Sequence, residues 1–263
     1  MWKELNKTVR SLRWITLIVA ILFCLSCNLG QNYQKIKVKR VIDGDTIELA
    51  NGELVRYIGI DTPETRKFVG DRWVNTADPF GEAAKEFNRQ LVEGRTVRLE
   101  FDVQKKDKYN RLLAYCFTDT DFVNAKLLKE GYGLLYTLPP NVKYVDLFVK
   151  LQKEARQNNR GLWAADEVVS VAEASKFIGK VKTVEGKVLS VKETNKTLFL
   201  NFGKDHKTDF TAVIFKNNLG AFLSQGPSPF KLKGKKVRIF GLIKEYNGPE
   251  IVIQDPSQIE VVE

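Results

Sequence analysis

The pattern of hydrophobic and polar residues in the first half of the chain predicts a β-rich unit. From Gln34 to Gly59 apolar residues alternate with polar ones, as expected of strands with one buried face. Asn51-Gly52 separates two such runs and is a strong hairpin signal, so Ile47–Leu49 should pair with Leu54–Ile58. Two later runs with the same alternation predict further strands, at 96–101 and 111–117.

Helical periodicity follows a polar stretch at 62–79, which we expect to be a loop. Residues 80–91 place Ala84, Phe87 and Leu91 on one face, and two further amphipathic helices are expected at 124–130 and 145–158. Gly161 provides a stop for the last of them. The first unit is therefore predicted to be mainly β with helices (α+β), an OB-type five-stranded barrel with three helices.

The second half predicts another β-rich unit. Residues 164–176 are rich in alanine and acidic residues and are interpreted as a linker or short helix between a domain at 35–163 and a domain at 177–263. Five strands with a helix before the fourth are typical of an OB-fold barrel. The expected strands are 180–192, 197–202, 210–215, 235–244 and 249–253, with the helix at 217–224.

The N-terminus predicts export. Residues 1–13 carry four basic residues and one acidic residue, and the uncharged apolar run Trp14 to Leu25 follows. That run has about 12 residues, short of the roughly 20 that span a bilayer as a helix. Cys24-Leu25-Ser26-Cys27 resembles a bacterial lipoprotein cleavage box, which predicts a signal peptide at 1–26, lipidation of Cys27 and a tether at 27–34. Ordinary signal-peptide release and an uncleaved anchor are the alternatives.

Charge favours a polyanionic partner. The chain of 263 residues has 42 Lys and Arg against 32 Asp and Glu, a net charge of +10. Removal of residues 1–26 takes away four basic residues and one acidic residue, so +7 remains. Nucleic acid and anionic membrane are both compatible with this charge, and no obligate protein partner is implied. The single histidine, His206, excludes mechanisms that need two.

Three short runs bring carboxylates to the ends of predicted strands. They are Asp43-Gly44-Asp45-Thr46, Asp61-Thr62-Pro63-Glu64-Thr65 and Asp107-Lys108-Tyr109-Asn110-Arg111. Hard cations such as Ca²⁺ and Mg²⁺ take oxygen ligands, and Asp45 and Asp61 stand at the beginning and end of an antiparallel strand pair that can bring them side by side. The Thr62 carbonyl can add a ligand, and Glu64 is placed to take a proton from water.

Two arginines complete the predicted site. Attack on a phosphodiester builds negative charge on the phosphate oxygens, and arginine meets that charge with a rigid fork that matches two oxygens. Arg56 on the hairpin and Arg111 after the Asp107 turn are the candidates. Together the carboxylates and arginines indicate metal-dependent cleavage of phosphodiesters.

In this order the motifs resemble the staphylococcal nuclease (thermonuclease) family over roughly residues 34–163, with Gly161-Leu162-Trp163 also in agreement. The resemblance implies a nuclease that cleaves DNA and RNA and leaves 3′-phosphates. It also implies that Ca²⁺ binds to Asp45, Asp61 and the Thr62 carbonyl, and that Glu64 is the general base. Further implied roles are phosphate binding by Arg56 and Arg111, contact with a neighbouring phosphate by Lys108 and Tyr109, and a base pocket lined by Tyr136.

The chain departs from the family pattern in three places. The hairpin between Thr46 and Arg56 is short, Asn110 replaces a usual glycine, and Leu138 stands where a second pocket tyrosine is expected. Asparagine tolerates the left-handed backbone conformation that such a turn can need. The expected function is that of an exported, membrane-anchored or secreted, Ca²⁺-dependent nuclease. The alternative is a non-catalytic protein that binds nucleic acid with both barrels.

Overall fold

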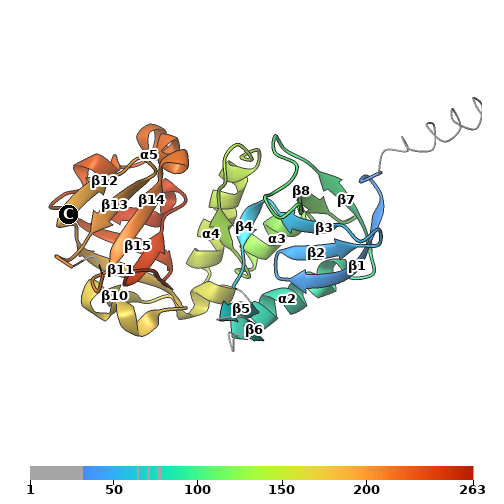
Figure 1. Cartoon of the computed structure of the whole chain (residues 1–263), viewed down its shortest axis with the longest axis horizontal. Coiled ribbons are helices and arrows are strands. Elements are labelled where there is room, and N and C mark those ends of the chain that lie inside the picture. Colours follow the sequence, from blue (N-terminus) through green and yellow to red (C-terminus); the bar gives the residue numbers. More distant parts are fainter. Residues whose placement is uncertain (1–31, 64, 70–71, 76–78, 206, 263) are drawn as a thin grey trace, which may run out of the picture. The chain divides into compact units, whose positions relative to one another are not determined.

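The computed structural model describes residues 32–63, 65–69, 72–75, 79–205 and 207–262. Its first half forms a closed barrel of five strands, in the order β1-β2-β3-β8-β7 (Figure 1). All neighbouring strands are antiparallel except β3 and β8, which are parallel. This confirms the first predicted barrel. The strands are β1 (Ile36–Asp43), β2 (Thr46–Leu49), β3 (Leu54–Tyr57), β7 (Thr96–Glu100) and β8 (Leu112–Phe117).

The predicted pairing of the two strands of the β2–β3 hairpin is confirmed. Ile47 pairs with Val55, and Gly52 in the connecting turn has a φ of 87°, which a residue with a side chain rarely adopts. The turn before β2 is tight for a different reason. A Cβ at Gly44 would lie 2.6 Å from Oγ1 of Thr62 and 2.9 Å from Cβ of Ala84, so only glycine fits there. This close approach brings the chain around Asp45 against the segment that follows β4.

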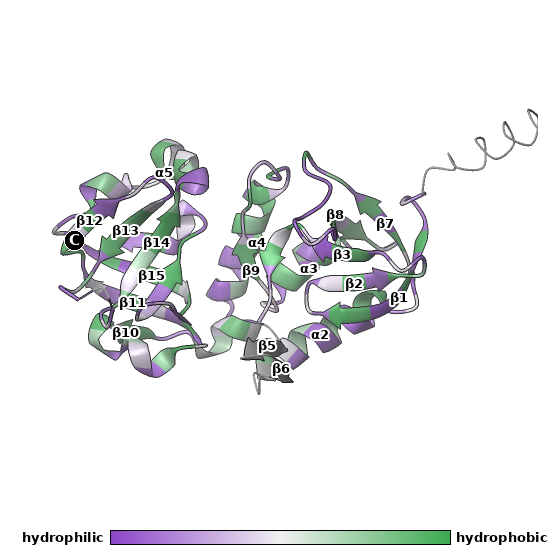
Figure 2. Cartoon of the chain, viewed as in Figure 1, coloured by the Kyte–Doolittle hydropathy of each residue, from purple (hydrophilic) through white to green (hydrophobic). Residues whose placement is uncertain are grey.

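Three described helices cover the barrel unit: α2 (Pro79–Val92), α3 (Val123–Lys129) and α4 (Val145–Gln157). Hydrophobic and hydrophilic residues are mixed along α2 and α4, as expected of helices that bury one side (Figure 2). Helix α2 contacts β1, and α3 packs against α4. The segment after α4 turns through Asn159 and Gly161, with φ of 51° and 53°. The predicted helices and the glycine stop are therefore confirmed.

The polar stretch 62–79 is not only a loop. Strands β5 (Arg66–Val69) and β6 (Arg72–Asn75) pair antiparallel within it, which corrects the sequence-based interpretation. The dipeptide Gly70-Asp71 between the two strands is a hairpin signal that could have indicated this. A second short pair joins β4 (Gly59–Asp61) to β9 (Leu134–Tyr136), with Asp61 opposite Leu134.

The C-terminal half forms two sheets, in the orders β10-β11-β15-β18 and β12-β13-β14-β17-β16. One hydrophobic cluster, which includes Val184, Leu200 and Phe222, lies under strands of both sheets. Among the described residues these strands form two separate sheets, and a second closed barrel, as the sequence predicts, is not seen. The elements are η1 (Gly161–Ala165), β10 (Val168–Ser170), η2 (Val171–Phe177), β11 (Val181–Lys187), β12 (Ser190–Glu193), β13 (Thr197–Asn201), β14 (Thr211–Phe215), η3 (Lys216–Asn218), α5 (Leu219–Gln225), η4 (Pro229–Lys231), β15 (Lys236–Leu242), β16 (Lys244–Glu245), β17 (Pro249–Val252), η5 (Pro256–Gln258) and β18 (Ile259–Val261).

The predicted linker is ordered into η1, β10 and η2, and residues Gln34 to Glu263 group as one compact unit. A small core joins the two halves, in which Leu162 and Trp163 pack with Val181 and Phe240. The predicted domain boundaries stay predictions. None of the described helices is long and apolar enough to cross a membrane. The predicted signal peptide and Cys27 lie outside the described residues.

Phe148 on α4 offers a test of the core. Its side chain is 1% exposed and contacts the rings of Tyr115 and Phe122. Phe148→Ala should lower the free energy of unfolding by about 3–5 kcal/mol, measured by urea denaturation, because it leaves a cavity in the core. Leu147→Ala is the matched control: Leu147 is 39% exposed, and its truncation should cost less than about 1 kcal/mol. Equal losses for the two variants would contradict this account of the core.

Candidate active site

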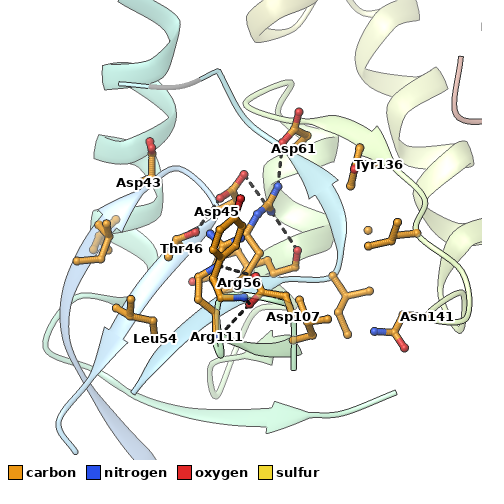
Figure 3. A pocket seen from close by; sticks show the side chains of 18 of the residues that line it. Asp43, Asp45, Thr46, Leu54, Arg56, Asp61, Asp107, Arg111, Tyr136 and Asn141 are labelled. Carbon is orange, nitrogen blue, oxygen red and sulfur yellow. Dashed lines mark hydrogen bonds and ion pairs between the residues drawn. The ribbon is translucent and has the colours of Figure 1, made fainter. Parts of the chain in front are cut away.

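A pocket of about 990 Å³ lies at the edge of the closed barrel (Figure 3). Its wall includes Asp45, Arg56, Asp61, Arg111 and Tyr136, all of which the sequence singled out. In Figure 3, Asp45, Arg56 and Asp61 point toward one another. Asp45 lies in the turn before β2, Arg56 is on β3, and Asp61 is the last residue of β4. The fold thus assembles most of the predicted site in one place.

Asp45 is the most enclosed of the pocket carboxylates, at 6% exposure. Its Oδ2 accepts hydrogen bonds from the backbone N–H and the Oγ1 hydroxyl of Thr62, at 3.0 and 3.1 Å. Its Oδ1 accepts one from Oγ1 of Thr46 at 3.0 Å. A buried carboxylate needs such partners to offset the loss of water. The sequence prediction that Asp45 and Thr62 belong to one site is consistent with these contacts.

Arg56 lies between Asp45 and Asp61. Its Nη1 is 3.0 Å from Oδ2 of Asp45, and its Nη2 is 2.8 Å from Oδ1 of Asp61. The guanidinium also donates to the Ile60 carbonyl at 2.8 Å and is only 13% exposed. Two carboxylates that contact the same guanidinium repel each other, and the positive charge of this arginine offsets the repulsion. The pocket therefore holds both carboxylates around one cation.

Asp61 is less enclosed than Asp45, with a side chain 30% exposed. Loss of hydration among the surrounding protein groups raises the pKa of the Asp61 carboxyl, and the negative charge of Asp45 acts in the same direction. The charges of Arg56 and of Lys244 oppose this rise. Ionised Asp61 thus depends on nearby positive charge, which is the electrostatic property that a cation site requires.

Asp107 organises the turn that carries Arg111. Its Oδ1 accepts from the backbone N–H groups of Tyr109 and Arg111, at 2.9 and 3.0 Å, and its Oδ2 lies 2.7 Å from Nε of Arg111. Burial acts to raise the pKa of Asp107, but the hydrogen bonds from Arg111 outweigh it and hold the pKa below its usual value. Asn110 has a φ of 65°, the left-handed conformation anticipated for the residue in place of glycine.

The predicted substrate contacts lie at the rim of the pocket. Tyr109 is 68% exposed, and the Lys108 ammonium is 4.9 Å from the centre of its ring. Tyr136 on β9 pairs with Gly59, and Leu138 also lines the wall. All three predicted contact residues, Lys108, Tyr109 and Tyr136, therefore border the pocket.

The pocket offers oxygen donors to a metal, from the carboxylates of Asp45 and Asp61. These hard oxygens match the preference of Ca²⁺ in kind. Across the part of the chain that the structure describes, however, no three His, Cys, Asp or Glu side chains are grouped closely enough to hold a metal ion. The third predicted acidic residue, Glu64, lies outside the described residues, although its neighbour Thr65 lines the pocket.

Sequence reasoning missed several residues of the pocket wall. Asn141 exchanges two hydrogen bonds of 2.8 Å with the backbone of Gln104 and so fixes one side of the wall. Lys85 comes from α2, and Lys244 comes from β16 in the C-terminal half. No local motif marks these residues, because they reach the pocket through pairing and packing between distant segments.

A five-stranded barrel with carboxylates, Arg56 and Arg111 in one pocket defines a candidate site for cleavage of phosphodiesters. Comparison with known proteins agrees. The family model of staphylococcal nuclease homologues matches residues 54–165. A thermonuclease of Staphylococcus intermedius is 45% identical over 138 residues, which are 51% of this chain and 77% of that protein. A thermonuclease of Staphylococcus hyicus is 39% identical over 137 residues, 51% of this chain and 78% of that protein.

The chain therefore belongs to the staphylococcal nuclease family. A further relative, endonuclease YncB of Bacillus subtilis, is 39% identical over 140 residues, which are 51% of this chain and 64% of that protein. The relatives support a nuclease of the hydrolase class, with nucleic acid as its substrate. They match about half of this chain.

The left-handed turn at Asn110 gives a prediction for the Arg111 segment. Asn110→Ala should lower the free energy of unfolding by about 1–2 kcal/mol, because a Cβ without a local hydrogen-bonding group is disfavoured at this φ. Asn110→Gly is the matched variant and should retain or slightly raise stability. Urea denaturation of the three proteins measures both effects. Equal stability of the alanine and glycine variants would show that the turn does not require this conformation.

Proposed function

We propose that this protein is an exported, Ca²⁺-dependent endonuclease that hydrolyses DNA and RNA with low sequence specificity and leaves 3′-phosphates. The observation that carries the proposal is the position of Arg56, which contacts Asp45 and Asp61 in the same pocket that Arg111 borders. A protein that only holds strands does not need carboxylates gathered around an arginine.

Calcium would be held by the carboxylates of Asp45 and Asp61 and by the carbonyl of Thr62. When bound, the ion supplies positive charge that stabilises negative charge on the phosphate during attack. The support for this assignment is the kind of donor and its placement. Both carboxylates border one pocket, and the Thr62 N–H and hydroxyl are already fixed against Asp45. Extracellular calcium is abundant enough to fill a site with few protein ligands.

Glu64 is proposed as the general base. Its carboxylate would accept a proton from the attacking water, whose oxygen bonds to phosphorus while the bond to the 5′-oxygen breaks. The 5′-oxygen takes up a proton from solvent and leaves as a hydroxyl group. The phosphate then remains on the 3′-oxygen. Placement of Glu64 at the pocket is supported by its sequence neighbours, since Thr65 lines the wall and Thr62 contacts Asp45.

Arg56 and Arg111 are proposed to bind the scissile phosphate. Arginine forks match two phosphate oxygens, and the charge that develops on those oxygens is met by groups already in place. Arg111 is held by Asp107, so its guanidinium does not have to be ordered when substrate arrives. At the rim, Lys108 and Tyr109 are proposed to contact a neighbouring phosphate, and Tyr136 to face a base.

The C-terminal half is proposed to be a second OB-type barrel. Two observations support this. Strands β11 and β12 belong to different sheets but are joined by a very short segment, and so are β15 and β16, so at each of these places the chain continues from one sheet into the other. The hydrophobic cluster under the two sheets is also continuous. Nine short strands can then form fewer long ones around one core, as in the partly open barrels of this class.

Calcium dependence and the base are tested together on single-stranded DNA. The protein should cleave with Ca²⁺ and not with a chelator, and Glu64→Gln should lower kcat by about 10²–10⁴-fold, because a positioned general base contributes that much. Glu82→Gln on α2, at an exposed position outside the pocket wall, is the matched control and should keep normal activity. Strand binding without calcium-dependent cleavage would instead favour the non-catalytic nucleic-acid-binding alternative.

Lipid anchoring at Cys27 is proposed from the sequence and is tested by fractionating cells. The protein should partition with membranes, and Cys27→Ala should move it to the soluble or released fraction, because the acylated residue is lost. Cys24→Ala is the matched control, since it changes a cysteine upstream of the expected cleavage point. If Cys27→Ala partitions as the unchanged protein does, anchoring through this cysteine is refuted.

A further inference from the structure

Lys244 brings a charge from the C-terminal half to the candidate active site. Its Nζ lies 3.8 Å from Oδ2 of Asp61, and its side chain forms part of the pocket wall. The other oxygen of Asp61 is 2.8 Å from Arg56. Asp61 therefore has a protein cation near each of its carboxylate oxygens. No other described residue of the C-terminal half is part of this wall.

The backbone around Lys244 is fixed. The preceding residue, Ile243, is fully buried, donates its N–H to the Lys180 carbonyl at 3.0 Å and accepts from the N–H of Gly179 at 2.8 Å. Lys244 itself pairs with Glu250 in the β16–β17 ladder. The acidic groups beside the Lys244 ammonium are thus Asp61 and Glu250. The sheet therefore fixes the backbone of Lys244 and the direction in which its side chain begins, although that side chain is 48% exposed.

Packing between the two halves also sets this position. Leu134, the strand partner of Asp61, and Leu242, two residues before Lys244, pack against the same cluster around Trp163 and Phe240. Strand β9, which pairs with the strand of Asp61, and the end of β15, which leads into Lys244, are therefore held by a shared core. The approach of Lys244 to Asp61 follows from that core and does not depend on a surface contact alone.

Arg156 strengthens the junction between the halves. It extends from α4, with its guanidinium carbon 4.0 Å from the centre of the Phe240 ring and its Nη2 2.9 Å from Oγ1 of Thr183. Its Nε lies 3.0 Å from Asp166. A planar cation that stacks on a ring and donates to two partners restricts movement at the junction.

We propose that Lys244 is an internal competitor of calcium at Asp61, through which the C-terminal half lowers the metal affinity of the nuclease site. This inference rests on the proposed calcium site. A divalent cation at Asp61 is repelled by the Lys244 ammonium. When the cation binds, the attraction between this ammonium and the Asp61 carboxylate is also lost. Lys244 contacts a proposed ligand and acts through it, so it is a positioning residue.

The test measures calcium binding without substrate. Isothermal titration of Ca²⁺ into the chain with both halves present compares the unchanged protein with Lys244→Met. We expect the variant to bind calcium about tenfold more tightly, because the ammonium that repels a doubly charged ion is removed from beside Asp61. The gain should shrink as ionic strength rises, because salt screens exposed charges.

Two further variants make the result specific. Lys236→Met removes the same charge from the same half, at a 51% exposed lysine that pairs with Glu185 and is not part of the pocket wall, so its calcium affinity should be unchanged. Lys244→Arg keeps the charge and should keep the affinity of the unchanged protein. Urea denaturation of each variant checks that the fold is retained.

The possible outcomes separate this inference from the proposed function. Equal affinities for the unchanged protein and Lys244→Met, with calcium-dependent cleavage intact, would overturn the inference alone. An equal gain in Lys236→Met would also overturn it, since net charge would then explain the effect. Absence of calcium binding in every variant would overturn both the inference and the proposed cofactor.

Discussion

The shared ion pairs of Arg56 hold the candidate site together. One guanidinium contacts Asp45 at 3.0 Å and Asp61 at 2.8 Å and so joins the ends of β2 and β4 through β3. Its direction depends on the hairpin register, in which Arg56 pairs with Thr46, the residue next to Asp45. A shift by one residue would turn Arg56 to the opposite face of the sheet, because side chains alternate along a strand. The Asn51-Gly52 turn that fixes this register is thus a requirement of the site as well as of the barrel.

Two close approaches of the backbone serve the same arrangement. Gly44 leaves no room for a Cβ beside Thr62, so the turn before Asp45 can lie against the segment after Asp61. Gly59 has a φ of 84°, and a Cβ there would lie 2.4 Å from the ring of Phe148. That ring belongs to the aromatic core under α4, and Gly59 begins the strand that ends in Asp61. The position of the second carboxylate therefore depends on the packing of a helix far along the chain.

Local signals explain which parts could be predicted from the sequence. The Asn51-Gly52 hairpin, the amphipathic helices and the left-handed turn at Asn110 are set by neighbouring residues, and the structure has them as expected. The β4–β9 pair and the junction around Trp163 and Phe240 depend on segments distant in the chain, and no spacing indicates them. The β5–β6 hairpin had a local signal, but its short strands carry many polar residues, which favoured the loop interpretation. Glu64, Cys27 and the signal peptide lie outside the described residues, so their roles stay predictions.

The charges around Asp61 connect the metal and the substrate in the proposed reaction. Asp45 and Asp61 contribute two negative charges, and Arg56 and Lys244, both in contact with Asp61, contribute two positive ones. This small group is therefore close to neutral by itself, while the other described residues of the pocket wall include more basic than acidic ones. A divalent cation would make the small group positive, while a phosphate near either protein cation would weaken that cation's hold on Asp61. Each ligand then favours the binding of the other, and thermodynamic linkage makes the two effects equal.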